Sequence, residues 1–187
     1  LSKRHGATSV DAFGAEGIIP EGMVNFLALL GWSLDGEHEL FSLAELERVF
    51  RPERVNPSPA VFDTAKLEWV NAQHLRALPE AERAARVSAF LESRGVDLSA
   101  RSAEWRMHFV RALGERLKTL RDAESYGRFA LHERIEPDAG AWAELLAKPA
   151  LAERLAALAD ALAGDAAFTP ESLEPLTRAV AAALGVK

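Results

Sequence analysis

The side chains best suited to chemistry in this 187-residue chain are its arginines, because six basic residues gather in one short stretch. Residues 101–121 hold only two acidic side chains, whereas the segments before and after them each carry a net charge of −5. A local excess of positive charge on an acidic background favours one defined anion site over nonspecific binding of polyanions. A solvated helix surface paired with acidic neighbours is the alternative interpretation. The six residues are Arg101, Arg106, Arg111, Arg116, Lys118 and Arg121.

Guanidinium groups are suited to such an anion site because they are permanently charged and present paired hydrogen-bond donors. Four arginines of this stretch recur every five residues, and five steps of about 100° leave each one roughly 140° from the last. We therefore expect them to spread around a helix rather than to face one groove.

Aromatic side chains accompany the arginines at helical spacing. Trp105, Phe109 and Tyr126 could stack on bases, but their spacing favours core packing. Trp69 is predicted to be buried for the same reason, and for Trp142 both interpretations stay open.

Several other chemistries have no support in the sequence. The absence of cysteine excludes disulfides, thiolate metal sites and cysteine nucleophiles. The five histidines show no metal-ligand spacing, and no carboxylate pair, Ser-His-Asp set or phosphate-binding glycine loop stands out. No apolar run approaches the roughly 20 residues of a membrane helix, and the N-terminus does not read as a signal peptide.

The elements that must position these side chains are predicted to be helices throughout. Strong start signals are Ser9, the Ser42–Glu45 capping box, Asp63 and Thr169 followed by proline. No alternating β-branched run indicates a sheet, so the predicted fold class is all-α. The predicted helices cover about 10–16, 20–30, 42–50, 63–76, 79–95, 102–117, 119–134, 138–147, 149–163 and 169–184, with domain boundaries near 76–79 and 136–137.

Four blocks of sequence resemble one family. LSKRHG resembles the end of the KLSKRHG signature loop of class I aminoacyl-tRNA synthetases. EGIIPEGMVNFLALLGWS, FSLAELERVF and NPSPAVFDTAKLEWVNAQHLRAL resemble bacterial glutamyl-tRNA synthetases just after that motif. LGERLKTLRDAESYGRF resembles the helical domain that follows in that family. The order and spacing of the blocks make the resemblance specific over roughly the first 130 residues, and looser afterwards.

The resemblance implies an all-α arrangement of three parts. Residues 1–78 would form the signature loop and stem-contact region, and 79–136 the first helical anticodon-binding domain. Residues 137–187 would begin a second helical anticodon-binding domain that is expected to be truncated. The family's nucleotide-binding domain and HIGH motif have no counterpart, so we expect an internal fragment of a longer enzyme that is inactive alone.

The resemblance also implies roles for individual residues. Ser2, Lys3 and Arg4 of the signature loop would bind the phosphates of ATP, which the parent enzyme uses with Mg²⁺; no cofactor is expected for the isolated fragment. The basic stretch 101–121 would carry base readout, because guanidinium groups pair with base edges and stack on unpaired bases in single-stranded loops. Arg116, within GERLKT, is the candidate for reading the third anticodon base, with Arg111 and Arg121 as alternatives. Contacts to the inner elbow of the tRNA are expected from Lys66, Asn71, Gln73 and Arg76.

The implied parent activity is the ATP-dependent joining of glutamate to glutamate tRNA. We expect glutamate tRNA as the partner of this chain, with glutamate and ATP as further ligands of the parent, and no membrane or DNA partner. The resemblance implies a cytoplasmic monomer. Two alternatives stay open, a glutaminyl-type relative, whose anticodon modules are β-barrels, and a non-catalytic helical interaction module.

Overall fold

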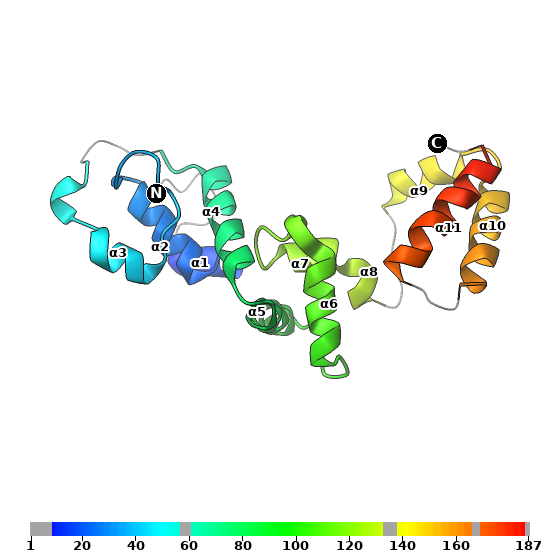
Figure 1. The fold of residues 1–187 in the computed structure, drawn as a ribbon, viewed down its shortest axis with the longest axis horizontal. Coiled ribbons are helices and arrows are strands. Elements are labelled where there is room, and N and C mark those ends of the chain that lie inside the picture. The colour runs from blue at the N-terminus through cyan, green and yellow to red at the C-terminus, as the bar shows by residue number, and fades with distance from the viewer. Residues whose placement is uncertain (1–8, 57–60, 133–137, 166–168, 186–187) are drawn as a thin grey trace. The chain divides into compact units, whose positions relative to one another are not determined.

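The computed structural model describes residues 9–56, 61–132, 138–165 and 169–185, and within them every regular element is a helix (Figure 1). The all-α prediction is confirmed. The chain divides into two compact units, Leu1–Ile135 and Glu136–Lys187. The three predicted domains and their boundaries stay predictions.

The first unit contains eight α-helices and two 3₁₀ helices among its described residues. They are α1 (Val10–Ala15), α2 (Pro20–Leu29), α3 (Leu43–Val49), η2 (Pro52–Arg54), α4 (Thr64–Ala77), α5 (Glu80–Ser93), α6 (Ala103–Leu113), η3 (Gly114–Arg116), α7 (Asp122–Tyr126) and α8 (Arg128–Leu131).

Three of these helices begin at the capping residues that the sequence predicts. The side chain of Ser9 accepts a hydrogen bond from the backbone of α1, and Asp63 accepts two from the first turn of α4. Ser42 and Glu45 form the complete capping box of α3. Each side chain satisfies backbone N–H groups that have no partner within the helix, so these start points follow from local chemistry.

Two predicted helices differ from those observed, and a glycine lies at each difference. The basic helix ends at Leu113 rather than near residue 117, because Gly114 takes a positive φ of 53°. The helix expected over 119–134 is divided at Gly127 into α7 and α8. A side chain at Gly127 would lie 2.4 Å from the ring of Phe109, so glycine allows the close approach of these segments.

The first unit has three groups of buried apolar side chains. One lies among α5, α6 and the segment that follows α6, and includes Leu91, Phe109 and Leu113. Another joins α1, α2 and α4, and the third surrounds Trp32 beside α3. Within the first group the rings of Trp105 and Phe109 stack 5.1 Å apart and nearly parallel, which supports the core interpretation of these two residues.

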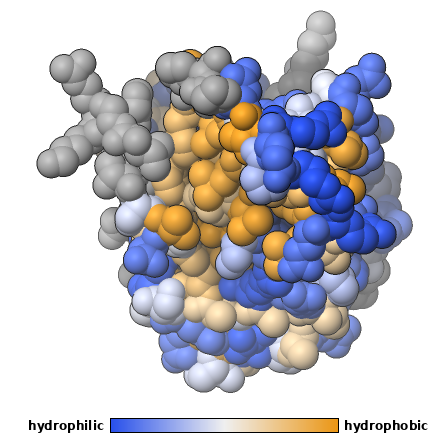
Figure 2. Space-filling view, turned by 90° about the vertical axis from the view of Figure 1, so that its left-hand side faces the viewer, coloured by the Kyte–Doolittle hydropathy of each residue, from blue (hydrophilic) through white to orange (hydrophobic). Residues whose placement is uncertain are grey.

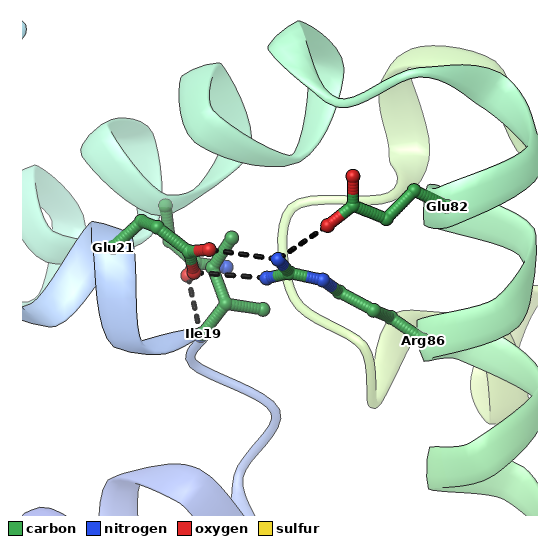
Figure 3. A network of polar contacts seen from close by, with 5 residues as sticks. Ile19, Glu21, Glu82 and Arg86 are labelled. Carbon is green, nitrogen blue, oxygen red and sulfur yellow. Dashed lines mark hydrogen bonds and ion pairs between the residues drawn. The ribbon is translucent and has the colours of Figure 1, made fainter. Parts of the chain in front are cut away.

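An ion-pair cluster joins α2 to α5 (Figure 3). The guanidinium of Arg86 donates two hydrogen bonds to the carboxylate of Glu21, at 2.7 and 2.9 Å, and one to Glu82 at 2.6 Å. The hydrogen bond from Arg86 holds the pKa of Glu21 below its usual value, and the same pairing raises the pKa of Arg86. This bidentate pair links segments that are 65 residues apart in sequence.

The second unit consists of α9 (Ala139–Leu146), α10 (Leu151–Ala163) and α11 (Pro170–Ala183). Asp138 and Thr169 cap α9 and α11 through their side chains. None of the described residues of this unit is fully buried, and Trp142 is 45% exposed.

Candidate functional site

A large cleft of the first unit lies where α1, the start of α4 and the segment 115–122 meet. It has a volume of about 990 Å³. Three of the six predicted basic residues line it: Arg116, Lys118 and Arg121. Tyr126 of α7 lines it too, and its ring is 52% exposed. The cleft therefore combines cationic groups with an accessible aromatic ring.

The charges in this cleft are only partly paired. Arg121 forms an ion pair with Glu16, at the end of α1. The carboxylate of Asp122 accepts hydrogen bonds from the backbone N–H groups of Lys118 and Thr119, at 3.0 and 2.7 Å. Neither the guanidinium of Arg116 nor the ammonium of Lys118 forms an ion pair with any other described residue.

Two acidic residues, Glu68 and Glu115, also line the cleft and have no ion pair within the described part of the chain. They reduce the positive potential of the cleft, so it is a mixed-charge surface rather than a strongly basic one. Such a surface favours a few defined phosphate contacts over a general attraction to RNA.

The buried side chain of Asn71 helps to hold the basic segment in place. Its Oδ1 accepts a hydrogen bond from the backbone N–H of Ile19 at 2.8 Å, and its Nδ2 donates to the carbonyl oxygen of Lys118 at 2.6 Å. A third link runs from the N–H of Leu120 to the carbonyl oxygen of Gly17, at 2.9 Å. These contacts join the α1–α2 turn, α4 and the loop that carries the basic residues.

The predicted tRNA contact by Asn71 does not fit this geometry. Its side chain is completely buried, and both ends of its amide already bond backbone groups. A side chain with no exposed surface cannot touch RNA, so we remove Asn71 from the predicted contact set. The sequence signal that suggested contact, a polar residue on α4, comes instead from a buried polar network.

The other predicted contacts of α4 are accessible but dispersed. The ammonium of Lys66 pairs with Glu39 at 2.5 Å and lies 4.8 Å from the ring centroid of Trp69. The predicted burial of Trp69 is wrong, since 38% of it is exposed. Gln73 is half-buried beside a small pocket, and Arg76 is exposed near the end of α4.

The three arginines of α6 and its N-terminal flank face different neighbours, as their five-residue spacing predicts. Arg101 lies over the ring of Trp105 at 4.5 Å. Arg106 pairs with Glu92 at 3.0 Å and donates to the carbonyl oxygen of Leu98 at 2.8 Å.

Arg111 pairs with Glu80 through two nitrogens, at 2.6 and 3.3 Å. This pair lies on α5 and α6. The six basic residues therefore divide into one cleft-lining group and three separately bonded arginines.

Ser2, Lys3 and Arg4, the predicted ATP-binding residues, lie outside the described residues. Within the described ranges no three His, Asp or Glu side chains are grouped so that they could hold a metal ion. Among the helices that the structure describes, none combines the length and apolar character that crossing a membrane requires.

Sequence reasoning assigns one accessible residue, Tyr126, to the core and misses another, Arg83. Tyr126 is considered for stacking, but its spacing favours core packing, and the structure leaves this residue 52% exposed at the cleft. Arg83 lies on α5, outside the basic stretch, and lines a pocket with Arg76 and Arg111. Nothing in one sequence brings α4, α5 and α6 together, so no local signal could have identified Arg83.

A second surface of the first unit is apolar and chemically unlike the cleft. A groove of about 460 Å³ lies between α2 and α3, lined by side chains such as Leu27, Leu43 and Val55. Figure 2 looks onto the side of the molecule that is at the left in Figure 1, where α3 lies. Apolar side chains gather on this face. This groove lacks the cationic groups that phosphate contacts need, so we do not include it in the candidate site.

A buried network around His74 predicts how the stability of this unit depends on pH. Its Nε2 lies 2.9 Å from Oδ1 of Asn25, an oxygen that also accepts from the backbone N–H of Phe41. Nε2 must therefore carry the hydrogen. Burial lowers the pKa of His74, and the charge of Glu21 opposes this only in part.

Because the folded state holds the pKa of His74 below its unfolded value of 6.5, the unfolded state binds more protons as the pH falls through that value. We expect the contribution of His74 to leave the free energy of unfolding constant above about pH 6.5. Below that pH, the free energy of unfolding should decline. Urea unfolding at pH 5.0–8.0 measures this decline. His74→Gln, which keeps a donor for Asn25, should flatten the curve, and an unchanged slope would contradict this role for His74.

The chain matches two family models of known proteins. Residues 1–69 match a family model described as "tRNA synthetases class I (E and Q), catalytic domain", and residues 72–187 match one described as "Anticodon binding domain". The two matched segments meet at α4, which carries Asn71. The second match covers more than half of the chain.

Two curated relatives are glutamate–tRNA ligases. That of Desulforudis audaxviator is 38% identical over 192 residues, a match that covers 100% of this chain and 38% of the relative. That of Synechococcus sp. (strain JA-3-3Ab) is 38% identical over 191 residues, covering 100% of this chain and 40% of the relative. The chain thus spans about two fifths of the length of these relatives.

The fold also matches that of a solved structure. A glutamate tRNA ligase from Elizabethkingia meningosepticum superposes with a TM-score of 0.77 at 24% identity, covering 100% of this chain and 36% of that one. At this identity the similarity establishes the fold.

Proposed function

Because this chain belongs to the anticodon-binding-domain family, we propose that it is the tRNA-binding part of a glutamate–tRNA ligase. Its partner would be glutamate tRNA, held at the inner elbow and the anticodon stem-loop. The parent reaction would use ATP, with Mg²⁺, to join glutamate to that tRNA. A cytoplasmic, monomeric parent enzyme is part of the same proposal.

The observation that carries this proposal is the cleft of the first unit. Arg116 and Lys118 line it without an ion pair among the described residues, and the exposed ring of Tyr126 lies on the same cleft. Cations can bind phosphate groups, and an exposed ring can stack on an unpaired base. This combination is typical of a surface that binds single-stranded or looped RNA.

The two alternatives receive less support. A glutaminyl-type relative would bring β-barrel anticodon modules, whereas the regular elements of the described residues are helices. A non-catalytic interaction module would explain the apolar groove between α2 and α3, but it would not explain the unpaired cations of the cleft.

The test is fluorescence anisotropy of the 187-residue chain with glutamate tRNA over a series of salt concentrations. We expect log affinity to fall linearly with log salt, because phosphate contacts release counterions. Arg116→Ala should weaken binding about tenfold at low salt, the loss typical of one charge-assisted contact. Arg48→Ala, which removes an exposed arginine from α3, is the matched control and should leave the affinity nearly unchanged.

A tRNA with a changed third anticodon base separates two roles of Arg116. If wild type discriminates between the two tRNAs and Arg116→Ala does not, Arg116 reads that base. An equal loss with both tRNAs would instead assign Arg116 to the phosphate backbone. Absence of binding even at low salt would contradict the proposed function.

A further inference from the structure

A second pocket of the first unit is lined by three arginines from three different helices. It has a volume of about 290 Å³ and lies beside the ends of α4 and α6 and the first turns of α5. Arg76 comes from α4, Arg83 from α5 and Arg111 from α6. Gly114 lines the same pocket, and Glu115 is the one carboxylate among the residues that line it.

Two of these three guanidinium groups have no carboxylate partner among the described residues. Arg83 has a buried Nε without any hydrogen-bond partner, and its Nη1 reaches the carbonyl oxygen of Arg76 only at 3.5 Å. Arg76 forms no ion pair within the described ranges. Arg111 alone is paired, with Glu80 at 2.6 Å.

A buried N–H group without an acceptor is uncommon, because an unsatisfied donor loses its hydrogen bonds to water and gains none in return. Here it belongs to a charged group beside a pocket that holds two further guanidinium groups. The pKa of Glu80 is lowered first by the hydrogen bond from Arg111, and then also by the charges of Arg83 and His108.

We propose that Arg76, Arg83 and Arg111 form a binding site for a phosphodiester group of the tRNA backbone, separate from the cleft that holds Arg116. A phosphate offers several strong acceptor oxygens, and guanidinium forks match them in pairs. Its oxygens would accept hydrogen bonds from the guanidinium groups that line the pocket, two of which have no carboxylate partner among the described residues. The inference rests on the proposed function and adds a second contact to it.

Such a contact positions the RNA without reading its sequence, and this property defines the test. Anisotropy is measured with the 187-residue chain, with glutamate tRNA and with the tRNA changed at the third anticodon base. Arg83→Gln should weaken binding about tenfold, reduce the salt slope by about one, and do so equally for both tRNAs. Arg48→Gln removes the same charge from α3 and should change neither quantity appreciably.

A second variant acts in the opposite direction, so that loss of folding cannot explain both results. Glu80→Gln removes the carboxylate that pairs with Arg111 and leaves this guanidinium free for phosphate. We expect tighter tRNA binding and a steeper salt dependence. Circular dichroism of each variant confirms that the helices are retained.

Inorganic phosphate separates an RNA site from a site for free anions. If phosphate raises the melting temperature of wild type but not of Arg83→Gln, while both bind tRNA equally, the pocket takes a free anion and the proposal is overturned. If wild type binds tRNA and Arg83→Gln binds it with the same affinity, the phosphate-site proposal is also overturned, but the proposed function stands. If wild type does not bind tRNA at all, both fail together.

Discussion

Replacing Gly17 with alanine should destabilise the first unit by about 3–5 kcal/mol, because two independent costs fall on one residue. Gly17 has a φ of +87°, a conformation that residues with a Cβ rarely adopt. A Cβ there would also lie 2.5 Å from the backbone nitrogen of Arg121 and 2.7 Å from that of Leu120. Both neighbours are main chain, so the loop itself must move and would weaken the Leu120–Gly17 hydrogen bond.

A matched glycine separates these two costs. Gly36 has a nearly identical φ of +91°, but nothing lies within 4 Å of the position that its Cβ would take. Gly36→Ala should therefore cost only the backbone strain, about 1 kcal/mol. Urea unfolding of the two variants beside wild type measures the difference. Equal losses would mean that the close approach of the α1–α2 turn to the basic loop contributes nothing to stability.

The parts of the fold that follow from local chemistry were predictable from the sequence. Ser9, Ser42 with Glu45, and Asp63 each start a helix where their side chains satisfy free backbone groups. The breaks near Gly114 and Gly127 were not predictable in the same way. Helical periodicity continues through both glycines, and the break at Gly127 accompanies its contact with Phe109, which is distant in sequence.

The sequence could predict which residue types the candidate site contains, but not their arrangement. The basic stretch does contribute the cations of the cleft, but sequence cannot tell which of them are already paired. Arg106 is bonded to Glu92 and Leu98, whereas Arg116 has no ion pair among the described residues. The pairing depends on which helices pack together, and that information lies in long-range contacts rather than in spacing.

Asn71→Ala should lower the free energy of unfolding by about 3 kcal/mol and also weaken tRNA binding. Removing the amide leaves the N–H of Ile19 and the carbonyl oxygen of Lys118 without their partner, and each unsatisfied buried group costs about 1–3 kcal/mol. The loop that carries Arg116 and Lys118 would lose one of its two backbone attachments. Asn71 does not touch RNA, so any effect on affinity must pass through this loop.

Asn25 provides the matched control for this prediction. It is equally buried and also holds two backbone groups, the N–H of Phe41 and the carbonyl oxygen of Glu39. Asn25→Ala should cost at least as much stability, because it loses the same kinds of backbone bonds and also the bond to Nε2 of His74, and yet leave the tRNA affinity of the folded protein unchanged. Both variants are compared by anisotropy at a temperature where circular dichroism shows them folded.

A double-mutant cycle then tests whether Asn71 acts through the loop. In a chain that already carries Arg116→Ala and Lys118→Ala, the loop has lost the side chains whose position Asn71 controls. Asn71→Ala should therefore reduce affinity further by much less than it does in wild type, a non-additive result. Additive losses would show that Asn71 influences RNA binding by another route. In that case Asn71→Ala would have the same effect whether or not the loop carries Arg116 and Lys118.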